Sequence, residues 1–296
     1  MMDIKCGFVT LAGPPNAGKS TLLNRLLREP LAIVSPRPQT TWNVVRGILT
    51  ESRGQVIFVD TPGLHDPRDD LGVHMVRAAR GALSGVNLIY WLEDCRKNAK
   101  DSFLQIKEYL PDGVPSLLIL NKVDLIPRSD LLPLIDHFAR LNVFREIIPL
   151  SALSGENVDA LLELTWRYLP EGSPLFPTDQ LSDQPERVLI REFIREQVFL
   201  HTRQEIPYSS AVKIEEIHEE SARKKIYIRA TIYAERESQR GMLVGKGGVM
   251  IKRIGTAARR RVEKLLGRPV FLELRVKVRK KWRKNKASLR EFGFTE

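Results

Sequence analysis

The sequence contains little cysteine and no long hydrophobic run. Its 296 residues include only two cysteines, Cys6 and Cys95, too few for a disulfide framework. We therefore expect both to be small buried side chains in a reducing compartment. No apolar stretch approaches the roughly 20 residues that span a bilayer, and Met1 to Cys6 lack the basic segment and apolar stretch that begin a secretory signal. These absences predict a soluble protein of the cytoplasm.

Positive charge is concentrated near the end of the sequence. Residues 244–296 contain 17 Lys/Arg against 4 Asp/Glu, whereas the whole chain contains 47 against 36. The first 243 residues therefore carry slightly more acidic than basic side chains, 32 against 30. A local excess of this kind attracts polyanions such as nucleic acid, whose released counterions favour binding. The alternative is a solvated basic tail without a specific partner.

Residues 7–168 alternate short apolar runs with amphipathic stretches. The short runs predict strands that are covered on both faces, at Phe8–Ala12, Val56–Asp60, Val86–Leu92, Ser116–Leu120 and Glu146–Leu150. The stretches between them predict helices, among them Thr21–Leu27, Val73–Leu83, Leu131–Leu141 and Val158–Tyr168. Repeated strand–helix units predict a doubly wound, mostly parallel α/β sheet with its site at the carboxyl ends of the strands.

A proline-rich stretch separates this block from a second one. Residues 170–185 contain four prolines and no sustained periodicity, which is typical of a linker or domain boundary. We therefore expect a first domain over residues 1–172, a linker over 173–186 and a second domain over 187–296.

The second block has the pattern of a small α+β domain. In residues 225–233 and 270–278 apolar and polar side chains alternate, which predicts strands of a sheet with one buried face. A helix is expected over residues 188–200, and an apolar stripe from Ile251 to Leu265 predicts another.

Eight residues after the first expected strand match the phosphate-binding pattern GxxxxGK[ST]. They are Gly13, Pro14, Pro15, Asn16, Ala17, Gly18, Lys19 and Ser20, and Thr21 follows them in the expected helix. The glycines allow backbone N–H groups to point at phosphate oxygens, with the positive end of the helix dipole behind them. Lys19 would neutralise the β- and γ-phosphates of a nucleotide, and the Ser20 hydroxyl would ligate Mg²⁺. The motif predicts a P-loop NTPase.

A second motif, Asp60-Thr61-Pro62-Gly63, ends the strand expected over Val56–Asp60. Its position would allow Asp60 to hold Mg²⁺, directly or through water. The N–H of Gly63 would contact the γ-phosphate.

Two further motifs predict which nucleotide base the protein binds. Asn121-Lys122-Val123-Asp124 follows a strand, and the carboxylate of Asp124 would accept two N–H bonds from guanine, whereas adenine lacks such a donor pair. Ser151-Ala152 follows the last strand of the first domain, where a backbone N–H would meet the guanine carbonyl. Together with the phosphate loop they predict GTP or GDP as the ligand.

With its motifs in this order, the sequence resembles the Era family of bacterial GTPases, within the translation-factor class. The resemblance implies slow, Mg²⁺-dependent hydrolysis of GTP to GDP and phosphate. It also implies that Thr40 and Thr41 lie in the first switch, with Thr41 as a Mg²⁺ ligand of the GTP state, and that Asp60 to Leu64 begin the second switch. Trp42 departs from the family, whose members commonly carry arginine there.

The residue after the Asp-x-x-Gly motif narrows the hydrolysis mechanism. Ras-like enzymes place glutamine there to orient water, which Leu64 cannot do. Backbone, another side chain or a partner must then position the water. Relatives with asparagine at the position of Asn16 often use a potassium ion near the phosphates, and the alternative for Asn16 is a turn residue. His65 beside this loop is expected to be solvated rather than a base.

A glycine-rich turn precedes the expected helix of the second domain. A Gly-x-x-Gly loop from Gly245 to Gly248, between helical segments of a small α+β unit, indicates a KH module, which clamps the nucleic-acid backbone beside a groove for unstacked bases. The element order resembles the type II KH domain of the Era family. The expected RNA contacts are Gly245, Lys246, Gly247, Gly248, Ile251, Lys252, Arg259, Arg260, Lys280, Lys281 and Arg283. Trp282 either stacks on a base or covers the end of the sheet.

Two functions of different classes fit these observations. In the first, GTP hydrolysis is a switch that controls RNA binding, and the resemblance implies the 3′ end of 16S rRNA as the target during assembly of the 30S ribosomal subunit. In the second, a constitutive RNA-binding protein holds guanine nucleotide as a static ligand. The intact switch residues Thr40, Thr41 and Asp60–Gly63 favour the first. We expect a monomer, and because the basic tail also suits anionic lipid, a peripheral contact with the inner membrane stays open.

Overall fold

The chain divides into two compact units. One comprises residues 1–66 and 75–183, and the other comprises residues 67–74 and 184–296. The computed structural model describes residues 4–35, 37–96, 106, 108–220 and 225–294. The first residues of the expected first domain and the last two of the expected second domain lie outside this described part.

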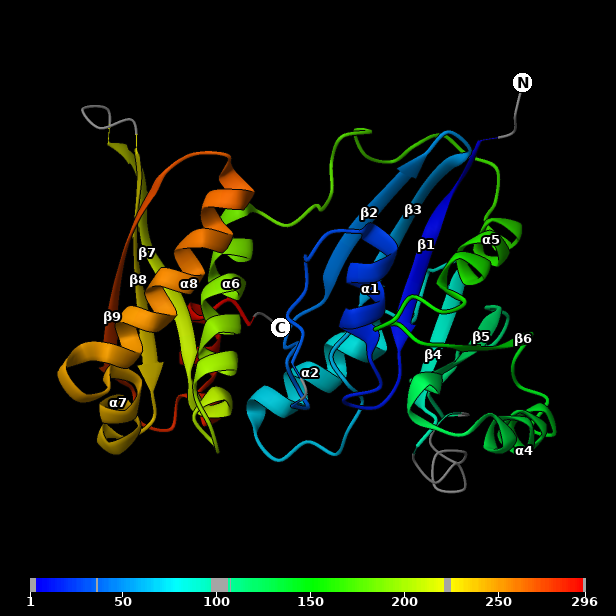
Figure 1. The fold of residues 1–296 in the computed structure, drawn as a ribbon, viewed down its shortest axis with the longest axis horizontal. Helices are drawn as coiled ribbons and strands as arrows, with labels where there is room; N and C mark the ends of the chain where they lie inside the picture. Colours follow the sequence, from blue (N-terminus) through cyan, green and yellow to red (C-terminus); the bar gives the residue numbers. More distant parts are fainter. Residues whose placement is uncertain (1–3, 36, 97–105, 107, 221–224, 295–296) are drawn as a thin grey trace. The chain divides into compact units, whose positions relative to one another are not determined.

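Among the described residues of the first unit, six strands form one sheet (Figure 1). In spatial order they are β2 (Val45–Glu51), β3 (Gly54–Asp60), β1 (Lys5–Ala12), β4 (Leu88–Asp94), β5 (Ser116–Asn121) and β6 (Glu146–Leu150). Neighbouring strands pair in parallel, except that β2 and β3 form an antiparallel pair. The predicted doubly wound, mostly parallel sheet is confirmed.

Helices cover both faces of this sheet, as parallel strands joined by crossovers require. They are α1 (Lys19–Leu27), α2 (Asp70–Gly81), α4 (Arg128–Ala139) and α5 (Val158–Tyr168). The alternation along β4 separates the faces: the hydroxyl of Tyr90 hydrogen-bonds Thr165 of α5, whereas Trp91 packs in one cluster with Ala79 of α2 and Phe138 of α4. Helices α1 and α5 contact each other.

In the first sheet, β2 and β4 show the largest differences from the sequence-based expectation. β2 is absent from the expected elements, because it is an edge strand whose residues are largely half-exposed and carry no continuous apolar run. β4 begins and ends two residues later than the expected Val86–Leu92. The carboxyl end of this strand is therefore Asp94, at the same edge of the sheet as Asp60 and Asn121.

The proline-rich segment after α5 runs along β2. The N–H of Ile48 in β2 donates to the carbonyl of Leu181 at 2.8 Å. The side-chain amide of Gln55 accepts the N–H of Phe176 at 2.9 Å and donates to the carbonyl of the same residue at 2.9 Å. This part of the expected linker is therefore bound to the first sheet by hydrogen bonds to the backbone of β2 and to the side chain of Gln55 in β3.

Three described strands of the second unit form a separate sheet. They are β7 (Ala211–Glu220), β8 (Lys225–Ala234) and β9 (Val270–Val278), with β7–β8 antiparallel and β8–β9 parallel. The helices of this unit are α6 (Glu186–His201), α7 (Glu237–Val244), α8 (Val249–Leu266) and α9 (Lys286–Glu291). Helices α6 and α8 lie side by side on one face of the sheet (Figure 1). The chain order α6–β7–β8–α7–α8–β9 confirms the predicted KH arrangement.

The burial of three side chains can be compared with the predictions from the sequence. Cys6 and Cys95 are buried free thiols, as predicted. Trp282 is fully buried and its indole N–H donates to the carbonyl of Ser209 at 2.9 Å, so it covers the end of the sheet and cannot stack on a base. Among the described residues, no helix combines the length and the apolar character needed to cross a membrane.

Replacement of Ile228 tests whether the core between β8, α6 and α8 stabilises the second unit. Ile228 is fully buried in the cluster that contains Ile194 of α6 and Ile254 of α8. We expect Ile228→Ala to lower the free energy of unfolding by about 2–5 kcal/mol, because it removes buried methylenes and leaves a cavity. The measurement is urea unfolding of the full chain followed by circular dichroism. Leu200→Ala removes as many carbons from a side chain that is 48% exposed and should cost much less; equal losses would contradict the assigned core.

Candidate functional site

The phosphate loop joins β1 to α1 in a conformation that requires its glycines. Gly13 has a φ of +134°, and a Cβ there would lie 2.3 Å from the carbonyl oxygen of Leu92 in β4. Gly18 has a φ of +100°, and a Cβ there would lie 2.1 Å from Nδ2 of Asn121. Both glycines therefore permit the loop to approach its neighbouring strands and turns closely.

Lys19 folds back over this loop. Its Nζ donates to the carbonyls of Gly13 at 3.0 Å and Pro14 at 2.9 Å, and the side chain is almost completely buried. The ammonium group is thus held at the centre of the loop, where it would meet phosphate oxygens.

A pocket lies over the loop and the start of α1. Its lining residues are Pro15, Asn16, Gly18, Lys19, Ser20, Thr21, Ile33, Val34, Ser35, Arg37, Gln39, Thr40, Thr41, Thr61 and Gly63. The predicted motifs omit Ile33, Val34, Ser35, Arg37 and Gln39. Their only signal in the sequence is their place directly before Thr40 and Thr41. Arg37 adds a second cationic side chain to the lining of the pocket.

Three predicted metal ligands lie together beside the pocket. The Ser20 hydroxyl donates to Oδ2 of Asp60 at 2.7 Å and lies 2.9 Å from Oγ1 of Thr41, which is 3.4 Å from the same carboxylate oxygen. In the described part of the chain, Oδ1 of Asp60 is buried and makes no hydrogen bond. Burial raises the pKa of Asp60 to about 6 against the opposing effects of Ser20, Lys19 and Thr41. A buried carboxylate beside two hydroxyls fits a hard cation such as Mg²⁺.

The backbone at the end of β3 approaches the phosphate loop. A Cβ on Gly63 would lie 2.7 Å from Cα of Pro15, and the N–H of Leu64 donates to the carbonyl of Gly13 at 3.1 Å. The Leu64 side chain is buried in the sheet core and cannot orient a water molecule. Nδ1 of His65 donates to the carbonyl of Gly63 at 2.7 Å, so this ring is bound to its own loop.

Trp42 anchors the segment that carries Thr40 and Thr41. Its indole is buried, and Nε1–H donates to the carbonyl of Gln39 at 3.0 Å. Gln39 adopts a left-handed conformation with a φ of +60°. The tryptophan therefore fixes the segment by its packing and by the hydrogen bond to Gln39.

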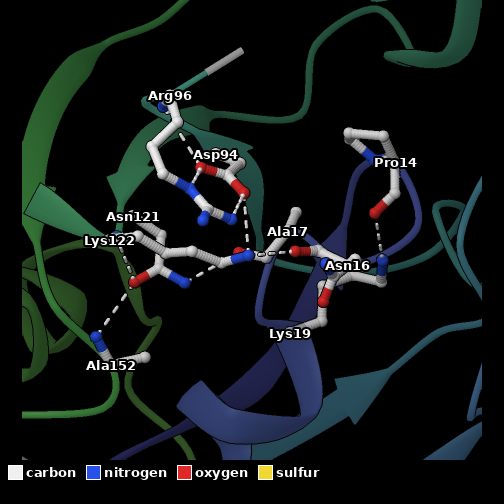
Figure 2. A network of polar contacts seen from close by, with 9 residues as sticks. All are labelled: Pro14, Asn16, Ala17, Lys19, Asp94, Arg96, Asn121, Lys122 and Ala152. Atoms are coloured by element: carbon white, nitrogen blue, oxygen red, sulfur yellow. Dashed lines mark hydrogen bonds and ion pairs between the residues drawn. The ribbon is translucent and has the colours of Figure 1, made fainter. Parts of the chain in front are cut away.

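The side chain of Asn121 connects three loops (Figure 2). Its Nδ2 donates to the carbonyl of Ala17 at 2.7 Å, and its Oδ1 accepts the N–H groups of Lys122 at 2.8 Å and Ala152 at 2.9 Å. Lys122 has a φ of +70°, and its Nζ donates to the carbonyl of Asn16 at 2.6 Å. The phosphate loop and the two motifs predicted to select the base are therefore joined by direct hydrogen bonds.

The remaining predicted residues of the nucleotide site support or flank it. Asp124 lies on the short turn Val123–Leu125 and its side chain is exposed. Ser151 is fully buried at the end of β6. The hydroxyl of Thr61 donates to the carbonyl of Leu11 at 2.8 Å, and Pro62 beside it is buried.

The glycine loop of the second unit is open where the sequence predicts an RNA contact. Gly245 has a φ of +73°, and a Cβ there would lie 2.8 Å from Cβ of Met250. Gly247 and Gly248 also have positive φ values, but a Cβ on Gly247 would meet no heavy atom within 4 Å and one on Gly248 would only touch Ile251 at 3.9 Å. The loop surface is therefore accessible.

Basic side chains lie in this loop, along α8 and after β9. Those predicted to contact RNA are largely exposed, namely Lys246, Lys252, Arg259, Arg260, Lys280 and Lys281. Ile251 is partly buried against the core of the unit. Arg283 differs, because it is partly buried and pairs with Glu235 at 3.0 Å.

Replacement of Asn121 tests its role as the connection between the loops. Asn121→Ala removes three hydrogen bonds and leaves buried backbone groups of Ala17 and Ala152 without their partner. We expect the free energy of unfolding of the nucleotide-free protein to fall by about 3 kcal/mol, measured by urea unfolding. Ser129→Ala, which removes an exposed hydroxyl of α4, should change it by less than about 0.5 kcal/mol. Similar effects of both variants would contradict the proposed connection.

The chain matches two known protein families, in different parts of the sequence. Residues 8–122 match a family described as 50S ribosome-binding GTPase, and residues 205–283 match the KH domain. The first match contains the phosphate loop and the Asp60 motif, and the second contains the glycine loop.

The chain is similar to curated bacterial proteins over nearly its whole length. It is 47% identical over 293 residues to GTPase Era of Syntrophus aciditrophicus, covering 99% of this chain and 96% of that protein. It is 46% identical over 292 residues to GTPase Era of Trichlorobacter lovleyi, covering 98% of each.

Solved structures agree with these relatives. An Era variant from Aquifex aeolicus bound to GDP·AlF4⁻ is 40% identical, with a TM-score of 0.94 over 99% of this chain and 100% of that one. A structure of Era with MgGDPNP and nucleotides 1506–1542 of 16S ribosomal RNA is also 40% identical, with a TM-score of 0.95 over the same shares. The two matched domains and this identity along nearly the full length show that the chain belongs to the Era family of GTPases.

Proposed function

We propose that the GTP hydrolysis catalysed by this chain is a switch that controls binding of the 3′ end of 16S rRNA through the KH domain, in assembly of the 30S ribosomal subunit. The observation that carries the proposal is the position of Thr41 beside Ser20 and Asp60. A static nucleotide would not need a switch residue in its metal site. The relative solved with MgGDPNP and 16S rRNA supports the same assignment.

Within the nucleotide site we assign roles by position. Lys19 neutralises the β- and γ-phosphates, and the backbone N–H of Gly63 contacts the γ-phosphate. Ser20, Thr41 and Asp60 hold Mg²⁺, which supplies positive charge to the phosphate oxygens. The buried and otherwise unpartnered Oδ1 of Asp60 among the described residues supports this ligand set.

Water positioning falls to groups other than Leu64, whose side chain is buried. Asn16 lines the pocket and is the residue that would hold a potassium ion next to the phosphates. Such an ion would supply charge that other GTPases take from an arginine.

Asp124 should select guanine by accepting hydrogen bonds from the 2-amino group and the N1–H of the base. Inosine triphosphate lacks the 2-amino group, so wild type should bind GTP more tightly than inosine triphosphate by roughly ten- to a hundredfold, the worth of one hydrogen bond to a charged acceptor. Asp124→Asn should lose most of this preference and of the preference for GTP over ATP. Competition against a fluorescent GDP measures all three nucleotides.

The matched control for this experiment is Asp130→Asn, an exposed carboxylate in the first turn of α4. It should leave the order of affinities unchanged. An unaltered preference in Asp124→Asn would show that another group reads the base.

In the second unit we propose that the open loop from Gly245 to Gly248 clamps the RNA backbone, with Lys246 on a phosphate. After residue 243 there are 17 basic side chains and only 4 acidic ones, which supports a polyanionic partner.

We further propose that the first domain spans residues 1–172 and the second spans residues 187–296, with a linker over 173–186. We also propose that the protein is a monomer in the cytoplasm. Anionic lipid is the competing partner for the basic tail.

Crosslinking with sequencing of bound RNA tests this clamp. We expect one site at the 3′ end of 16S rRNA that depends on whether a GTP analogue or GDP is bound. Gly247→Asp/Gly248→Asp should abolish the site, because two carboxylates would face the phosphates while the space around both positions accommodates them. Gly113→Asp, at a positive φ with no atom within 4 Å, adds the same charge in the first unit and should leave it intact.

Diffuse crosslinks that are indifferent to both nucleotide and substitution would overturn the RNA part of the proposal. A sharp site that ignores the nucleotide would instead favour a constitutive RNA-binding protein with a static ligand.

A further inference from the structure

A buried carboxylate that belongs to none of the nucleotide motifs lies next to them. Asp94 ends β4 and is the register partner of Asn121 in β5. It is 2% exposed. Figure 2 shows its carboxylate bound to the side chains of both Lys122 and Arg96.

The first contact of Asp94 is with the lysine of the base-selecting motif. Oδ2 of Asp94 lies 2.8 Å from Nζ of Lys122, and the same ammonium group donates to the carbonyl of Asn16 at 2.6 Å. Lys122 therefore extends from β5 to the phosphate loop with its charged end held by two acceptors. Of these two, only Asp94 carries a charge.

The second contact keeps Asp94 ionised. The guanidinium of Arg96 binds both carboxylate oxygens, with Nη2 2.7 Å from Oδ2 and Nε 3.0 Å from Oδ1. The backbone N–H of Arg96 also donates to Oδ1, at 3.1 Å. Burial would raise the pKa of Asp94, but the hydrogen bonds from Arg96 and Lys122 outweigh it and hold the pKa well below its usual range. Without the carboxylate, two cations would face each other.

We infer that Asp94 is a positioning residue for guanine-nucleotide binding, which holds Lys122 against the phosphate loop so that this loop and the Asn121–Asp124 motif keep one geometry. The inference rests on the proposed roles of those two motifs. Asp94 itself need not touch the nucleotide. Its effect reaches the ligand through the ammonium group of Lys122, and Arg96 sustains the charge on which that effect depends.

The experiment compares Asp94→Asn with wild type in affinity for fluorescent GDP and in kcat and KM for GTP. The amide keeps the size of the side chain but removes its charge. We expect the Kd for GDP and the KM for GTP to rise by roughly ten- to a hundredfold, while kcat changes by less than about threefold. Asp136→Asn, which breaks an exposed ion pair with Arg140 at 2.6 Å, should leave all three values unchanged.

A double-mutant cycle with Lys122→Met separates positioning from general stabilisation. If Asp94 acts through Lys122, adding Asp94→Asn to Lys122→Met should raise the Kd for GDP by less than about twofold. Additive losses, or an unchanged Kd with a lower unfolding midpoint in Asp94→Asn, would overturn the inference.

Asp124→Asn, measured in parallel, distinguishes this inference from the proposed guanine site. If Asp124→Asn weakens guanine binding and Asp94→Asn does not, only the role of Asp94 is wrong. If neither variant changes guanine binding, the site itself is wrong.

Discussion

The nucleotide site depends on one buried amide, that of Asn121. Its nitrogen and oxygen reach the phosphate loop at Ala17 and the last loop at Ala152, although these residues are far apart in the sequence. A buried polar group left unpaired is costly, so displacing one of these loops would break hydrogen bonds that it shares with the others. The close approach of Gly18 to the same amide adds a steric reason for one geometry. The phosphate loop and the two predicted base-selecting motifs are thereby joined through one side chain.

Much of the fold follows from the sequence, because buried strands of a parallel sheet are nearly continuous apolar runs. The expected bounds of β6 and α5 coincide with those in the structure. β2 could not be predicted from the sequence because it has no continuous apolar run. It is an edge strand in which polar and apolar residues mix, and its place depends on pairing with β3. The shifted end of β4 has a related cause, since Glu93 and Asp94 are acidic residues that the fold buries: Glu93 accepts the indole N–H of Trp91, and Asp94 binds Arg96 and the distant Lys122.

The phosphate, metal and base residues could be predicted from motifs, because each motif is a local pattern at the end of a strand. The structure brings Ser20, Thr41 and Asp60 together, as the resemblance implies. Residues without a local pattern, such as Arg37 in the pocket, could not be found in this way. Whether a basic side chain is accessible also depends on tertiary contacts, which separate the paired Arg283 from the exposed Lys280 and Lys281.

The segment that follows α5 has a consequence for solubility. β2 is the outer strand of its sheet, and an exposed edge of backbone N–H and C=O groups can recruit strands from other molecules. The hydrogen bond from Ile48 to Leu181 and the packing of Phe176 near Ile48 cover part of this edge. The residues that join the two units therefore also cover part of the β2 edge and reduce self-association of the first sheet. A first domain that ends at residue 172 would lack this cover, and its exposed β2 edge would be prone to aggregation.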